Sequence, residues 1–174
     1  MESDVRLDRM LLEANNPRDV RFRKDRNILN ITGTGVMLFG AWSVIKTYTY
    51  FFEAPEEMFD GITEISDVGT LEIIMLSVLI SLILSFDLLV RFYVGMKSRA
   101  ESKGKKTGSF YLVVTGFLSF TSLGFLFFEL MSVMENPDIY SFAEMIVELT
   151  SFVIQMELII SAIRIKVYKP GKVK

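Results

Sequence analysis

Four long apolar blocks alternate with short polar segments along the chain. The blocks cover residues 28–52, 71–95, 109–133 and 141–167, and acidic residues, glycine and proline separate them. A helix that crosses a bilayer needs roughly 20 mainly apolar residues, and each block reaches that length. The pattern therefore predicts an all-α integral membrane protein in which residues 28–167 form a four-transmembrane-helix bundle.

Residues 1–27 precede the first block and carry many charges of both signs. This segment lacks the short apolar core and the small-residue cleavage site of a signal peptide, so we expect the first block to be a retained helix. Within it, residues 4–14 place apolar side chains at roughly helical spacing, and Asn15, Asn16 and Pro17 follow. The spacing predicts an interfacial helix on the inner membrane surface or docked on a partner. The alternative is a solvated, partly frayed end.

The basic residues are distributed unevenly over the segments outside the blocks. Residues 53–70 and 134–140 contain no Lys or Arg, whereas three other segments collect them: Arg6, Arg9, Arg18, Arg21, Arg23, Lys24 and Arg26; Lys97, Arg99, Lys103, Lys105 and Lys106; Lys166, Lys169, Lys172 and Lys174. Cytoplasmic loops are enriched in Lys and Arg. We therefore predict an N-in/C-in topology with a basic cytoplasmic tail at 168–174. The short loops and the clear bias favour a bacterial-type inner cell membrane.

Composition excludes several classes of function. The hydrophobic fraction of 51% resembles that of soluble domains, so the distribution of apolar residues carries the membrane prediction. A net charge of -2 and a pI near 5.3 argue against nucleic acid as a partner. The chain has no Cys, which excludes disulfides, thiolate zinc sites and iron–sulfur clusters. It has no His, which removes the commonest haem ligand and the usual acid or base near neutral pH. We predict no cofactor and no metal site.

Ionisable residues inside the predicted spans fall into two layers. The inner layer consists of Asp87, Arg91, Glu157 and Arg164. The outer layer consists of Lys46, Glu129, Glu144 and Glu148. Charges inside a membrane span usually face protein or water and mark functional sites. The alternative is structural, because paired charges also fix which helices meet and in what register.

The fourth block carries polar residues on two sides of its predicted helix. At about 100° per residue, Glu144, Glu148, Ser151 and Gln155 lie along one side, whereas Glu157 and Arg164 point nearly the opposite way. A helix in an isolated four-helix bundle has one side that faces lipid, where polar groups are disfavoured. The two polar sides therefore indicate self-association or a membrane partner subunit, in addition to the lipid bilayer.

Glycines recur in two of the blocks. Gly33, Gly35 and Gly40 lie in the first, and Gly116 and Gly124 lie in the third. Small residues permit close approach of helices in membranes, so we expect packing contacts at these positions.

Three classes of function remain open. A non-catalytic membrane subunit or scaffold, with buried charges that fix helix packing, fits the absence of a reactive constellation, and we predict no catalytic residue. A small oligomeric ion channel or ion-coupled transporter fits the acids within the spans. A membrane enzyme that acts on lipids fits least.

Overall fold

A computed structural model of the chain describes residues 17–53, 70–135, 137 and 139–167, and all of its regular elements in these ranges are helices. They are α2 (Pro17–Glu53), α4 (Thr70–Ser102), α5 (Phe110–Glu135) and α6 (Ile139–Val167). The surface helix predicted at 4–14 and the tail at 168–174 lie outside the described residues.

Each of the four helices contains a stretch long and apolar enough to cross a membrane. These stretches are Val20–Thr49, Ser77–Ser102, Phe110–Met134 and Ser141–Val167. The prediction of an all-helical chain with four candidate spans is confirmed. The helices also extend beyond the predicted spans, since α2 begins at Pro17 and α4 continues to Ser102. Proline suits the first turn of a helix because that turn leaves its backbone N–H groups without intrahelical partners.

The end of α4 is fixed by a glycine with left-handed backbone geometry. Gly104 has a φ of 81°, its N–H donates to the carbonyl of Glu101 at 2.8 Å, and the N–H of Lys105 donates to the carbonyl of Ala100 at 3.1 Å. These two hydrogen bonds form a Schellman motif with Gly104 just after the helix. The chain then turns over a short connection into α5.

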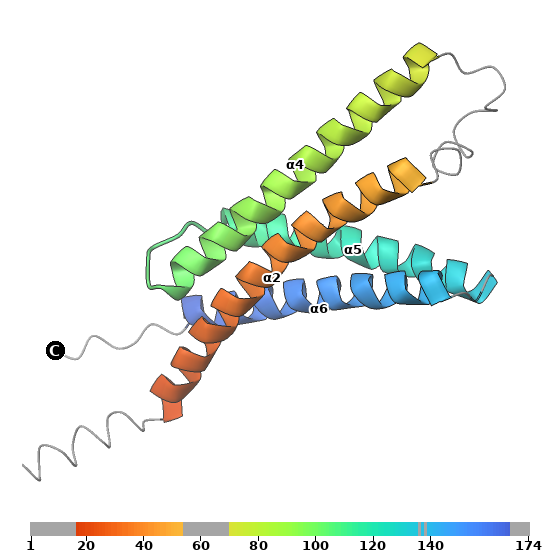
Figure 1. The fold of residues 1–174 in the computed structure, drawn as a ribbon. Coiled ribbons are helices and arrows are strands. Elements are labelled where there is room, and N and C mark those ends of the chain that lie inside the picture. The colour runs from red at the N-terminus through yellow and green to blue at the C-terminus, as the bar shows by residue number, and fades with distance from the viewer. Residues whose placement is uncertain (1–16, 54–69, 136, 138, 168–174) are drawn as a thin grey trace, which may run out of the picture.

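The helices form two pairs that cross and then diverge. The chief contacts join α2 to α4, α5 to α6 and α2 to α6, while α4 and α5 touch much less. Figure 1 shows the α2–α4 pair and the α5–α6 pair close together near the start of α5 and separating towards the other end. We call these two regions the converging end and the splayed end.

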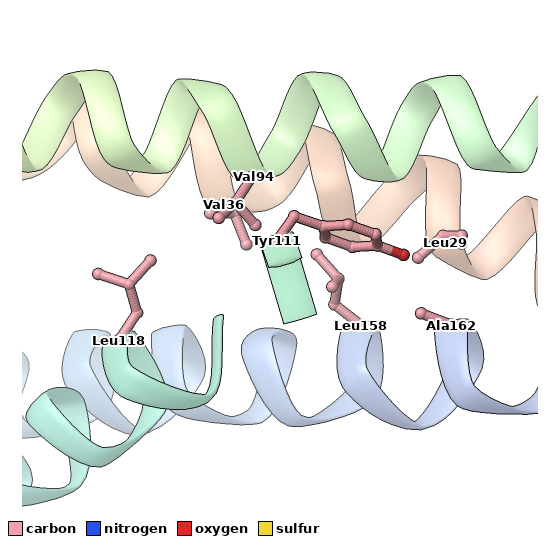
Figure 2. Packing of buried hydrophobic residues seen from close by; sticks show 7 residues of the cluster. All are labelled: Leu29, Val36, Val94, Tyr111, Leu118, Leu158 and Ala162. Carbon is pink, nitrogen blue, oxygen red and sulfur yellow. The ribbon is translucent and has the colours of Figure 1, made fainter. Parts of the chain in front are cut away.

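A small apolar core lies where the two pairs cross (Figure 2). All four helices contribute to it: Leu29, Val36, Val94, Tyr111, Leu118, Leu158 and Ala162 are buried. Many large apolar side chains instead point outwards, among them Phe117, Phe120 and Phe128, which are 70% or more exposed. An apolar exterior around a small interior is expected for helices surrounded by lipid, where burial of apolar surface does not drive helix association.

Glycine permits the close contact between α2 and α4. A Cβ atom added to Gly95 would lie 2.5 Å from the carbonyl oxygen of Gly33, and one added to Gly33 would collide with Ser98. A side chain at either position would push the two helices apart. The expectation of close packing at Gly33, Gly35 and Gly40 is confirmed, since atoms of other helices lie against all three. The same expectation for Gly116 and Gly124 is wrong, because no atom of another described helix lies within 4 Å of a Cβ built there.

Candidate functional site

Charged residues from all four helices gather between the core and the splayed end. Nζ of Lys46 on α2 lies 2.7 Å from Oε1 of Glu144 on α6. Glu129 on α5 lies within electrostatic reach of both Glu144 and Lys46. The charges of Arg91, Lys46, Asp87 and Glu144 all act on Glu148 of α6. We call these six residues the splayed-end cluster: Lys46, Asp87, Arg91, Glu129, Glu144 and Glu148.

Asp87 and Arg91 bring α4 into this cluster. Nε of Arg91 donates to Oδ2 of Asp87 at 2.8 Å, one turn apart on the same helix. The acid precedes the base, which is the favourable order for such a pair. The aliphatic part of Arg91 lies directly against Gly40 of α2, where a larger residue would displace it. Gly40 therefore makes room for the guanidinium between the two helices.

The splayed-end cluster contains more acids than bases. Four carboxyl groups accompany one ammonium and one guanidinium. Among the described residues, no group of three or more acids is placed to hold a metal ion.

A seam of small polar side chains continues from this cluster between α5 and α6. Nε2 of Gln155 donates to Oγ of Ser122 and to Oγ of Ser151, both at 3.2 Å. Thr115 and Ser119 extend the seam along the same side of α5, and Oγ1 of Thr115 donates to the carbonyl of Tyr111 at 2.7 Å. All five side chains are buried, and Gln155 is only 1% exposed.

Two atoms of the seam are buried without a hydrogen-bond partner. They are Oγ of Ser119 and Oε1 of Gln155. A buried polar group without a partner costs roughly 1–3 kcal/mol by mutational measures, so native proteins leave few of them. Apolar groups, or polar groups with all their hydrogen bonds formed, would give more stable helix packing.

A second polar cluster closes the seam at the converging end. Glu101, near the end of α4, is 8% exposed and accepts hydrogen bonds from the hydroxyls of Tyr111, at 2.6 Å, and Thr107. Nζ of Lys166 on α6 lies 3.6 Å from Oε2 of Glu101, donates to Oγ of Ser109 and lies over the ring of Tyr111. We call this the converging-end cluster: Glu101, Thr107, Ser109, Tyr111 and Lys166.

The two clusters and the seam together form one polar column through the bundle. Along α5 the column passes Tyr111, Thr115, Ser119, Ser122 and Glu129, whose spacing of three, four or seven residues keeps them on one side of the helix. Along α6 it passes Glu144, Glu148, Ser151, Gln155 and Lys166. Gln155 contacts Ser122, and Lys166 contacts Tyr111. The spacing from Tyr111 to Ser122 along α5 equals the spacing from Gln155 to Lys166 along α6, so both contacts fit one antiparallel register of the two helices.

The structure divides the predicted inner layer. Asp87 and Arg91 pair and join the splayed-end cluster, whereas Arg164 lies 3.7 Å from Asp25 of α2 and is 64% exposed. Glu157 is exposed on the outer side of α6 and forms no ion pair with any described residue. The predicted outer layer, Lys46, Glu129, Glu144 and Glu148, is brought together, with Glu144 as the direct partner of Lys46.

Sequence reasoning did not select Glu101. Its one signal in the sequence is isolation, because it is the only acid between Asp87 and Glu129 and it stands among Lys97, Arg99 and Lys103. Such a residue looks like a solvated loop charge. Only the turn after α4, which brings Tyr111 over Glu101, shows that the carboxyl group is buried.

No protein-family model, no curated protein and no solved structure matches this chain. The geometry of the polar column is therefore the basis for any proposal about function.

Proposed function

We propose that this chain is a multi-pass membrane protein that carries protons across the membrane along the polar column. The observation that carries this proposal is the alignment of the column. Between the acids at the two ends, Glu148 and Glu101, buried hydroxyl and amide groups lie along the facing sides of α5 and α6, and two of their atoms lack partners. Ionisable groups within spans are expensive and commonly form proton relays.

A proton suits the seam better than a larger cation does. Thr115 and Gln155 are almost completely buried, which leaves little space for a hydrated ion. A metal cation needs several oxygen ligands at once, and the described acids are not placed to supply three together. A hydroxyl group can accept one proton while it donates another, so a chain of hydroxyls and single waters is sufficient for proton movement.

Proton flux into liposomes tests this proposal directly. Purified protein is reconstituted with a pH-sensitive dye inside, and a potassium potential set by valinomycin supplies the driving force. We expect acidification of the lumen with the wild-type protein, and at least tenfold slower flux with Glu148→Gln or Gln155→Leu. Glu157→Gln is the matched control, because Glu157 lies on the same helix but outside the column. Folded wild-type protein without flux, or full flux in Gln155→Leu, would contradict the proposal.

We further propose that both termini face the cytoplasm of a bacterial-type inner membrane. The support is the absence of Lys and Arg from 53–70 and 134–140, since basic residues are retained on the cytoplasmic side. In this orientation the splayed-end cluster opens towards the outside and Glu101 towards the cytoplasm. Protons would then enter at the acid-rich cluster and leave near Lys166.

A second candidate function is that of a non-catalytic subunit in a homo-oligomer or a membrane complex. The observation that favours it is Glu157, an exposed carboxyl group well inside the stretch Ser141–Val167. A charge near the centre of a span costs about 2.5–3.5 kcal/mol on insertion scales, and a partner that covers it offsets this cost. Under this second candidate the charges of the column fix helix packing.

Cysteine cross-linking in native membranes tests the second candidate. A cysteine at Ile160, on the exposed side of α6 close to Glu157, should form disulfide-linked dimers if a second copy covers this side. A cysteine at Phe117, on the exposed side of α5, is the control. Equal cross-linking at both positions, or none at either, would argue against self-association through α6.

A further inference from the structure

An open apolar pocket lies between α2 and α6, apart from the seam between α5 and α6. It has a volume of about 450 Å³. Most of its lining comes from two turns of α2, and α6 adds one residue: Leu38, Phe39, Ala41, Trp42, Ile45 and Val147. Leu38, Trp42 and Ile45 are each more than half exposed, so the pocket opens outwards from the bundle. A ligand dissolved in the membrane can therefore reach it from the side.

Contacts between α2 and α6 bound this pocket at both ends. Towards the core, a Cβ atom built on Gly35 of α2 would lie 3.2 Å from Cγ2 of Ile154 on α6. Towards the splayed end, Nζ of Lys46 lies 2.7 Å from Oε1 of Glu144. All of the lining residues fall between these two contacts along their helices. The pocket is therefore a recess of limited length, and not part of a continuous apolar face.

The outer end of the pocket carries charge. Lys46 stands one turn after Trp42, and Glu144 stands one turn before Val147, so both charged residues share the sides of the helices that line the pocket. Their side chains are 32% and 24% exposed. Glu129 of α5 lies within electrostatic reach of both. Two acids thus accompany one base at this end, which favours a positively charged ligand.

The lining itself also suits a cation with an apolar body. Ligand pockets are mostly apolar, hold roughly 300–1,000 Å³ and carry a few charged or polar groups that orient the ligand. The faces of aromatic rings attract cations, and tryptophan does so most strongly. Trp42 and Phe39 supply such rings within this pocket. An acyl chain of an ordinary lipid would fill the apolar part but would make no use of the acids.

We propose that this pocket binds an amphipathic organic cation from the membrane. The apolar body lies against Trp42 and Val147, and the positive charge lies towards Glu144 and Glu129. Cations with a quaternary phosphonium or ammonium centre and aromatic substituents have this chemistry. Binding requires the pocket and the acids at its end but not the seam, so the proposal stands or falls independently of proton flux.

Trp42 reports on the pocket directly, because it is the only tryptophan in the chain. Its fluorescence is followed in full-length protein in a non-ionic detergent while tetraphenylphosphonium or tetraphenylborate is added. The two ions have the same shape and opposite charges. We expect a saturable change with tetraphenylphosphonium and only the linear response of detergent partitioning with tetraphenylborate. Saturation by both ions at similar concentrations, or by neither, would overturn the proposal.

A variant that fills the pocket tests where the cation binds. Ala41→Phe places a bulky side chain among the lining residues and should abolish the saturable response. Ile31→Phe is the matched control, because Ile31 is an exposed residue of the same helix outside the pocket. Saturable binding that persists in Ala41→Phe, or is lost equally in Ile31→Phe, would overturn the site. Melting temperatures without the cation check that both variants fold.

Charge variants test the orientation of the cation. Glu129→Gln should weaken binding of tetraphenylphosphonium by about threefold, and Lys46→Met should strengthen it by about the same factor, because removal of the ammonium group leaves Glu144 to the ligand. Glu157→Gln is the control, since Glu157 lies on α6 outside the pocket. A purely structural role of Lys46 predicts weaker binding in Lys46→Met. Unchanged or weaker binding in that variant would overturn the assignment of the charge to these acids.

Competition with lipid identifies the occupant in a bilayer. In nanodiscs of phosphatidylcholine with brominated acyl chains, bromine quenches the fluorescence of Trp42 wherever a chain contacts it. Tetraphenylphosphonium should reduce this quenching relative to nanodiscs of unbrominated lipid. Quenching that tetraphenylphosphonium does not change would show that a lipid chain keeps the pocket, and would overturn the proposal.

Discussion

Nζ of Lys46 lies 2.7 Å from Oε1 of Glu144, which ties α2 to α6 at the level where the two helix pairs begin to separate. The two side chains are 32% and 24% exposed. The ion pair joins one helix of each pair and so opposes their separation. Glu129 of α5 and Glu148 of α6 lie within electrostatic reach of both partners.

A double-mutant cycle measures the coupling between Lys46 and Glu144. Lys46→Met should lower the free energy of unfolding by about 1–3 kcal/mol, because it leaves Glu144 without its cation. The change should be smaller when Glu144→Gln is present in the same chain. Melting in detergent gives the four values of the cycle. The pair Lys46→Met and Glu148→Gln is the control, and equal coupling in both cycles would mean that Glu144 is not the specific partner.

The helices could be predicted from the sequence, whereas the partners of the charges could not. Apolar length is a property of the chain itself, so four spans follow from counting. Glu144 and Glu148 stand one turn apart on the same side of α6, and depth alone does not decide which of them meets Lys46. That choice depends on how far α6 slides along α2, which is a property of the packed pair.

The glycines of α2 and α5 also show which features the sequence predicts and which depend on the packed structure. Any glycine in a span can allow close approach, but only a contact with another helix makes use of it. Gly33 meets Gly95 because α2 and α4 cross there, while Gly116 and Gly124 stand on an open side of α5. The sequence likewise predicts the two polar sides of α6. It does not say that the side with Gln155 meets α5.

Substitution of glycine by alanine should have opposite effects at Gly95 and Gly116. At Gly95 the new Cβ atom would lie 2.5 Å from the carbonyl oxygen of Gly33, so the helices must separate, at a cost of about 1–3 kcal/mol. At Gly116 nothing lies within 4 Å, and Gly116→Ala should be neutral or stabilise by up to about 1 kcal/mol. Melting temperatures in one detergent compare the two. A stable Gly95→Ala protein would show that the α2–α4 contact is looser than described.

The orientation in the membrane can be tested with single cysteines, because the chain contains none of its own. Cysteines at Gly61 and Asn136 should react with an impermeant thiol reagent in intact cells. A cysteine at Lys105 should react only after the cells are opened. Lys105 is an exposed residue of its connection, whereas the neighbouring Ser102 is buried and would stay unlabelled on either side. Labelling of Lys105→Cys in intact cells would reverse the proposed topology.

Tyr111 tests whether the converging-end cluster holds the bundle together. Its hydroxyl donates to Oε2 of Glu101 at 2.6 Å, and its ring lies under Nζ of Lys166. Tyr111→Phe keeps the ring and removes the donor, so the buried carboxyl group loses one of its partners. We expect a loss of about 1–3 kcal/mol in the free energy of unfolding. Tyr93→Phe is the matched control, since the hydroxyl of Tyr93 forms no hydrogen bond with a described residue while its ring packs against Phe110.

Glu101→Gln should reduce the effect of Tyr111→Phe, because a neutral amide needs the hydroxyl less than a carboxylate does. If Tyr111→Phe costs as much in the Glu101→Gln protein as in the wild type, the hydroxyl acts through the packing of α5 and not through this carboxyl group.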